Sequence, residues 1–111
     1  MTIAQLTSPD HVDQVVVATG LTWLFKHSNA CPTSFAALDQ VETYHKEHAA
    51  VPIHMVVVQT DRPVSNYIAE TLSRVHQSPQ LFLLNNGEVV WSGSHWGITA
   101  EAMQQAVEAA Q

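Results

Sequence analysis

Residues 21–35 read LTWLFKHSNACPTSF, and the change of pattern within this stretch decides the fold. Residues 21–25 form a continuous apolar run, which is typical of a strand buried on both faces of a sheet. Further along, Cys31 precedes Pro32, and proline favours the first position of a helix because its missing N–H is not needed there. The stretch therefore predicts a buried strand, a short polar turn and a helix that begins at the single cysteine of the chain.

The rest of the chain continues this alternation of helices and strands. Asn86 and Gly87 separate two apolar runs, and Asn-Gly is the strongest short signal for a hairpin. Periodicity and capping signals predict helices over residues 9–20, 32–50, 64–74 and 99–110, and further strands over residues 53–58, 81–84 and 88–91. A right-handed crossover makes the first two strands parallel, and the hairpin extends the sheet in the antiparallel sense.

The order of elements predicts one α/β domain over residues 1–111. It matches the thioredoxin-like fold, with a four-stranded mixed sheet, helices on both faces and an extra N-terminal helix. That fold places its nucleophilic cysteine after the first core strand, at the start of the next helix. Cys31 falls at this point in the order.

The composition is typical of a globular protein with a net negative charge. Four Lys and Arg residues stand against ten Asp and Glu residues, for a formal net charge of −6, so we expect neither nucleic acid nor a membrane as a partner. The seven histidines lack a zinc-binding spacing, and no metal site is expected. The absence of a secretion signal and the single unpaired cysteine favour the cytoplasm. We also expect a monomer.

The residues around Cys31 favour a reactive thiol. The thiolate is the nucleophile in disulfide exchange, and a helix N-terminus stabilises it through free N–H groups, here those of Thr33 and Ser34. The Ser34 hydroxyl is a further expected donor, and Lys26 and His27 lie upstream as sources of positive potential. An inert buried cysteine is the alternative, but the polar neighbours favour exposure. Without a second cysteine, any disulfide must form with another molecule.

Ser78 and Pro79 precede the third predicted strand. An isolated X–Pro bond is cis in only about 5% of cases. The thioredoxin-like fold, however, carries a cis-proline beside its cysteine, where the backbone of the preceding residue pairs with the thiol substrate. The fold therefore predicts a cis bond here. The loops that should flank the site also contain His76, Ser94, His95 and Trp96.

Five short motifs occur together between residues 21 and 110: FKHS (25–28), CPTS (31–34), RPVSN (62–66), SPQ (78–80) and SHW (94–96). Together they resemble the YtxJ family, the monothiol bacilliredoxins of the bacillithiol redox system. The resemblance implies a thioredoxin-like fold and a thiol–disulfide oxidoreductase that removes bacillithiol from mixed disulfides on other proteins. It also implies bacillithiol as a cosubstrate and no tightly bound cofactor.

The resemblance also assigns the site by position. Ser34 stands where dithiol relatives have their resolving cysteine, while Ala30 and Thr33 depart from the commoner TCPIS form, which concerns substrate detail more than the reaction. By analogy with glutaredoxins, residues 93–95 hold the polar end of the small thiol. The expected site comprises Cys31 as the catalytic residue, Pro32, Thr33 and Ser34 as the active-site motif, and Lys26, His27, Ser78, Pro79, Ser94 and His95 as substrate-binding residues.

Other functions remain open at the level of the sequence. Glutathione is small and anionic like bacillithiol, so a glutathione-dependent monothiol glutaredoxin is one alternative. A non-catalytic thiol sensor is another. An iron–sulfur carrier is a third, although cluster-binding monothiol glutaredoxins usually have glycine where this chain has Pro32.

Overall fold

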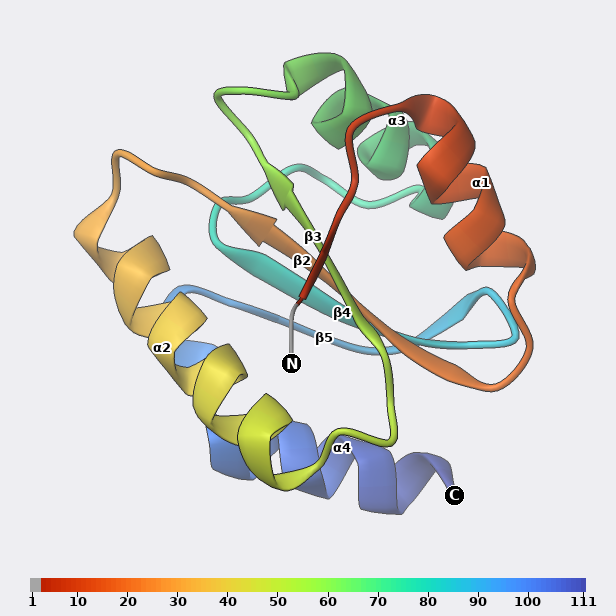
Figure 1. The fold of residues 1–111 in the computed structure, drawn as a ribbon, viewed down its shortest axis with the longest axis vertical. Coiled ribbons are helices and arrows are strands. Elements are labelled where there is room, and N and C mark those ends of the chain that lie inside the picture. Colours follow the sequence, from red (N-terminus) through yellow and green to blue (C-terminus); the bar gives the residue numbers. More distant parts are fainter. Residues whose placement is uncertain (1–2) are drawn as a thin grey trace.

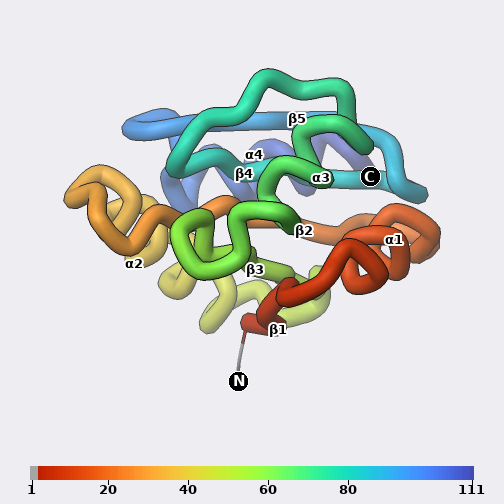
Figure 2. Tube along the Cα trace, turned by 90° about the horizontal axis from the view of Figure 1, so that it is seen from above, coloured from red at the N-terminus to blue at the C-terminus, as the bar shows by residue number. Residues whose placement is uncertain are grey.

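The computed structural model describes residues 3–111 and contains a five-stranded mixed sheet. The strands are β1 (Ala4–Gln5), β2 (Leu21–His27), β3 (Ile53–Val57), β4 (Gln80–Asn85) and β5 (Glu88–Ser94). Figure 2 shows them in the order β1-β3-β2-β4-β5, with β5 at the upper edge and β1 at the lower. β1, β3 and β2 are parallel, whereas β4 is antiparallel to both of its neighbours.

Helices cover both faces of the sheet. α1 (Pro9–Val17) and α3 (Arg62–Leu72) lie on one face, and α2 (Pro32–Glu47) and α4 (Ala100–Ala110) lie on the other (Figure 1). Side chains alternate along β2, so Trp23 and Phe25 join the core cluster under α2 and α4, while Leu24 joins the cluster under α1 and α3. The apolar run at residues 21–25 is therefore buried on both sides. This is the thioredoxin-like α/β fold that the sequence predicts.

The hairpin turn between β4 and β5 is held against the segment that follows α1. Asn86 and Gly87 have positive φ angles of 52° and 83°, as a type I′ turn requires. The side-chain oxygen of Asn86 accepts the N–H of Gly20 at 2.7 Å, and the Asn86 N–H donates to the Gly20 carbonyl at 3.0 Å. The predicted turn thus also fixes the entry into β2.

Some element boundaries differ from the sequence prediction. The sheet has a fifth strand, β1, which pairs with β3, and two residues are too few to show any periodicity. α1 ends at Val17 and not at residue 20, because Ala18 is already extended. α2 ends at Glu47 and not at residue 50, because His48 leaves the helical region. Within residues 3–111, no helix has the length and apolar character needed to cross a membrane.

One row of paired residues marks the end of the sheet next to Cys31, which we call the functional end. Lys26 of β2 pairs with Gln80 of β4, and Gln80 pairs in turn with Ser94 of β5. The end of β2, the start of β4 and the end of β5 therefore lie together, on the left in Figure 1. Cys31 follows β2 at this same end.

Candidate active site at the start of α2

Cys31 is the N-cap residue of α2 and is partly exposed. Its backbone is extended, with φ −119° and ψ 120°, and Pro32 occupies the first turn of the helix. The N–H groups of Ser34 and Phe35 donate to the Cys31 carbonyl at 3.0 and 3.3 Å and close that turn. The structure places the thiol at a helix start, as the sequence predicts.

The first turn of α2 lowers the pKa of the Cys31 thiol. The backbone N–H of Ser34 has the largest effect, because a hydrogen-bond donor near the sulfur stabilises its charged form. Desolvation opposes it by raising the pKa, while the N–H and the hydroxyl of Thr33 lower the pKa further. Although the Cys31 side chain makes no capping hydrogen bond, these nearby donors favour the charged form, because a thiolate is a stronger acceptor than a neutral thiol. A lowered pKa makes Cys31 a better candidate nucleophile at neutral pH.

The Ser34 hydroxyl does not act on the sulfur, contrary to the sequence prediction. Ser34 is wholly buried, and its hydroxyl oxygen accepts the Ser28 N–H at 2.8 Å. The same oxygen lies 2.9 Å from Nδ1 of His27, so its proton is free to point at that nitrogen. Burial lowers the pKa of His27, partly offset by hydrogen bonding to Ser34 and by the charge of Glu42. The neutral His27 ring therefore helps to fix Ser34 in the first turn of α2.

Lys26 is predicted to bind substrate, and the structure corrects this prediction. Its side chain is 0% exposed, and its ammonium nitrogen lies 3.0 Å from Nδ1 of His76. Neighbours in a strand point to opposite faces, so Lys26 turns toward the α1–α3 side while His27 turns toward α2. Burial lowers the pKa of Lys26 to about 8. His27 is also buried, at 4% exposure, and it contacts the first turn of α2 through Ser34 and through an edge-to-face contact with Phe35.

Gln59 also supports the candidate site, and no pattern in the sequence predicts this role. Its amide nitrogen donates to the Ser28 hydroxyl at 2.6 Å, and its amide oxygen accepts the Asn29 N–H at 3.0 Å. Gln59 thereby braces the turn that leads into Cys31. The topology gives one usable signal, since parallel β2 and β3 end at the same edge and Gln59 comes just after β3.

The segments around Ser78 and His95 meet beside the end of β2. The Ser78–Pro79 peptide bond is cis, and the Pro79 carbonyl accepts the His95 N–H at 3.2 Å. Ser94 is the last residue of β5, and His95, with a positive φ of 52°, begins a short 3-10 helix over residues 95–97. These predicted substrate-binding residues thus lie at the functional end of the sheet. The backbone of Lys26 lies there as well, but its side chain is buried on the α1–α3 side.

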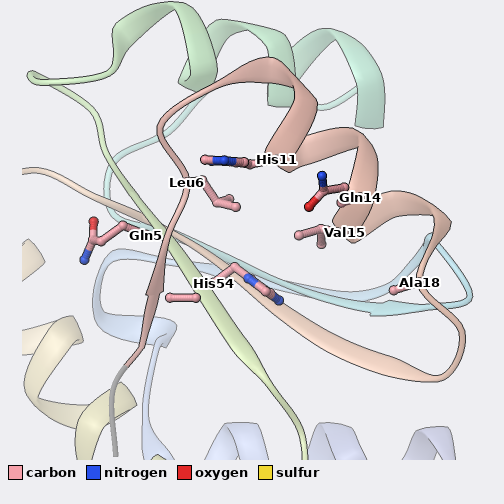
Figure 3. Close-up of a pocket in the computed structure, with 8 residues that line it drawn as sticks. Gln5, Leu6, His11, Gln14, Val15, Ala18 and His54 are labelled. Atoms are coloured by element: carbon pink, nitrogen blue, oxygen red, sulfur yellow. The ribbon is translucent and has the colours of Figure 1, made fainter.

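A pocket of about 340 Å³ lies away from Cys31 between β1, α1 and β3 (Figure 3). None of the predicted site residues lines it. Its walls are Ala4, Gln5, Leu6, His11, Gln14, Val15, Ala18 and His54. In the part of the chain that the structure describes, no three His, Cys, Asp or Glu side chains gather as metal ligands.

Known structures resemble this chain over nearly its whole length. One is a thioredoxin-fold protein assigned as an oxidoreductase; it is 35% identical, has a TM-score of 0.87, and the match covers 94% of this chain and 92% of that one. Thioredoxin from Fasciola hepatica, 14% identical, has a TM-score of 0.78 over 98% of this chain and 100% of its own. Oxidised thioredoxin from Plasmodium falciparum, 16% identical, has a TM-score of 0.75 over 98% of each chain. The two thioredoxins show the fold alone.

The sequence itself matches one family across most of its length. The pattern of the family described as monothiol bacilliredoxin BrxC covers residues 4–103, which include Cys31 and the loops on either side of it. The family and the 35% identical relative support a thiol redox function. They also confirm the resemblance inferred from the five sequence motifs. The chain belongs to the monothiol bacilliredoxin BrxC family.

Proposed function

We propose that this protein removes bacillithiol from mixed disulfides on other proteins by a monothiol route through Cys31. The observation that carries the proposal is the position of this lone thiol at the N-cap of α2, where the N–H of Ser34 lowers its pKa. Membership of the bacilliredoxin family supports bacillithiol as the small thiol. Ser34 supports the monothiol route, because a hydroxyl cannot form the internal disulfide that a resolving cysteine forms.

The reaction balances as two thiol–disulfide exchanges. In the first, the Cys31 thiolate attacks the bacillithiol sulfur of the mixed disulfide. A disulfide forms between Cys31 and bacillithiol, and the substrate protein leaves as a thiolate that takes a proton from water. In the second, the thiolate of another bacillithiol attacks the bacillithiol sulfur of the adduct. Cys31 leaves as a thiolate, and bacillithiol disulfide is the product.

The substrate must approach the partly exposed sulfur from the functional end of the sheet. There, we expect the backbone around Ser78 to pair with an extended disulfide substrate and residues 93–95 to hold the polar end of the small thiol; the hydrogen bond from the His95 N–H to the Pro79 carbonyl, which joins the two segments, supports this arrangement. Lys26 takes no part in this contact because it is buried on the other face.

Intact-mass measurement tests the proposal directly. The reduced protein is incubated with bacillithiol disulfide or with glutathione disulfide, and then with a test protein that carries one of these thiols on a single cysteine. We expect Cys31 to gain the mass of bacillithiol, to keep it until more bacillithiol is added, and to release the test protein. The Cys31→Ser variant is the control and should do neither.

The other outcomes identify the rival functions. Uptake and turnover with glutathione alone would make the protein a glutathione-dependent reductase. Adduct formation without turnover would make Cys31 a sensor, and a coloured protein with bound iron would indicate a cluster carrier. Deconjugation that persists in Cys31→Ser would refute the proposal outright.

A further inference from the structure

Lys26 and His76 join the strand that leads to Cys31 to the loop that leads into β4. The ammonium nitrogen of Lys26 lies 3.0 Å from Nδ1 of His76, and within residues 3–111 no other side chain or carbonyl oxygen accepts a hydrogen bond from it. Lys26 is buried, whereas His76 is exposed and open to protonation from solvent. An ammonium only donates, so Nδ1 of His76 must accept and the ring proton must lie on Nε2. The contact requires a neutral His76.

The backbone of Lys26 holds the same loop from a second side. Lys26 pairs with Gln80 in the ladder between β2 and β4. The side chain of Gln80 then reaches back along the loop, where its oxygen accepts the Gln77 N–H at 3.2 Å and its nitrogen donates to the Val75 carbonyl at 3.1 Å. The loop over residues 75–79 is thus held by the Gln80 amide and by the His76–Lys26 contact.

We propose that His76 is a positioning residue for thiol exchange: when neutral, it holds the loop that carries Ser78 and Pro79 against Lys26, and when protonated, it releases this loop. The inference rests on the function proposed above, because it assumes a disulfide substrate that pairs with this loop. His76 itself touches neither the substrate nor Cys31 in this role.

The charges that face His76 give this contact its pH dependence. Lys26 faces it from β2, Arg62 acts on it from α3, and the Ser65 hydroxyl of α3 lies 3.5 Å from Nδ1. Although His76 is exposed, partial desolvation of its ring is the largest cause that lowers its pKa from the ordinary value of 6.5, followed by the charges of Lys26 and Arg62, so the ring is neutral at pH 7. Once protonated, it loses its acceptor and repels both cations. The loop is therefore released in acid.

Release of the loop should weaken substrate binding without changing the thiol itself. We expect KM to rise by up to about fivefold as the pH falls from 7.5 through the lowered pKa of His76, which is the loss of one hydrogen bond's contribution. The reaction of Cys31 with iodoacetamide needs no loop contact, so it should follow the pKa of the thiol alone.

The test compares the intact protein with three variants from pH 5 to pH 8, using a test protein that carries bacillithiol or glutathione on one cysteine. His76→Gln keeps an acceptor that does not titrate, so its KM should stay low and flat with pH. His76→Ala removes the acceptor, so its KM should be raised at every pH. His11→Gln is the matched control and should behave as the unaltered protein, because Nδ1 of His11 also accepts a hydrogen bond, from the Thr7 N–H at 3.1 Å, but in α1.

The inference is wrong if His76→Gln retains the acid rise in KM, or if His76→Ala has an unaltered KM at pH 7.5. A different result would refute the proposed function instead: Cys31 is alkylated normally, but neither the unaltered protein nor any variant removes the small thiol from the test protein at any pH. Amide hydrogen exchange of residues 75–78 still shows in that case whether the loop is released. Lower protection at pH 5.5 than at pH 7.5, seen in the unaltered protein and absent in His76→Gln, supports release, and equal behaviour of the two overturns it.

Discussion

The hydroxyl oxygen of Ser34 lies 2.9 Å from Nδ1 of His27 and 2.8 Å from the Ser28 nitrogen, deep beneath the first turn of α2. The backbone N–H of the same serine does more than any other group to lower the pKa of Cys31. Ser34 therefore anchors the turn through its side chain and stabilises the thiolate through its backbone. The same residue thus contributes both to the packing of the first turn and to the lowered pKa of Cys31.

The Ser34→Ala substitution tests this double role. It leaves the Ser28 N–H and the buried His27 nitrogen without their partner, so the free energy of unfolding should fall by about 1–3 kcal/mol. A less fixed first turn should also raise the pKa of Cys31. Urea unfolding and the pH dependence of iodoacetamide alkylation measure the two effects. Ser92→Ala is the control, an exposed serine on β5 outside the site. A stable variant with an unaltered alkylation profile would contradict the role assigned to Ser34.

The Thr33→Val substitution should separate reactivity from stability. Valine keeps the backbone N–H and the shape of threonine but removes the hydroxyl that lowers the pKa of Cys31. The alkylation midpoint should move to higher pH, while the free energy of unfolding should change by no more than about 0.5 kcal/mol.

Thr43→Val is the matched control, since it lies in the same helix and its hydroxyl donates to the Asp39 carbonyl at 2.8 Å. Its alkylation profile should be unchanged. Equal shifts in both variants would mean that the Thr33 hydroxyl has no specific effect on the sulfur.

Gly87 should be the least replaceable glycine of the fold. Its φ of 83° is unfavourable for any residue with a Cβ atom, and a methyl group there would collide with the Val16 carbonyl of α1. Gly87→Ala should therefore lower the free energy of unfolding by about 2 kcal/mol or more. Gly97→Ala is the control, because its φ is ordinary and a methyl group there meets nothing. Thermal unfolding measures both variants. Similar losses of stability in both would rule out the packing of the Asn86–Gly87 turn against α1 as the cause.

The sequence predicts the frame of this molecule better than the details of its site. Buried runs, Asn86-Gly87 and Pro32 are local signals, and local signals suffice to place β2, the hairpin and the start of α2. The direction of a side chain at the end of a strand is a different matter. Lys26 and His27 are adjacent, yet one is buried against the α3 side and the other contacts Ser34. Only the register with β4 and the arrangement of the helices decide which of the two side chains faces α2.

Gln59 and His76 are two further residues whose contacts the sequence does not predict. Each acts on the site across a long sequence separation, through hydrogen bonds to Ser28 and to Lys26. Glutamine and histidine in loops carry no local pattern that marks such contacts. They become visible only when the parallel pair of β2 and β3 and the antiparallel pair of β2 and β4 bring these loops to one end of the sheet.

The buried ammonium of Lys26 should give the protein an unusual dependence of stability on alkaline pH. Burial lowers the pKa of Lys26 from 10.5 in the unfolded chain to about 8 in the folded one. Between these two values the unfolded state binds more protons than the folded state, so the free energy of unfolding should rise with pH across this window, by up to about 3 kcal/mol. Methionine at this position has no charge to desolvate. The Lys26→Met variant should lack this rise, and its stability relative to the unaltered protein should be greatest below pH 8. Urea unfolding of both proteins from pH 7 to pH 10 measures the difference, and two parallel stability curves would show that Lys26 does not carry a buried charge in the folded state.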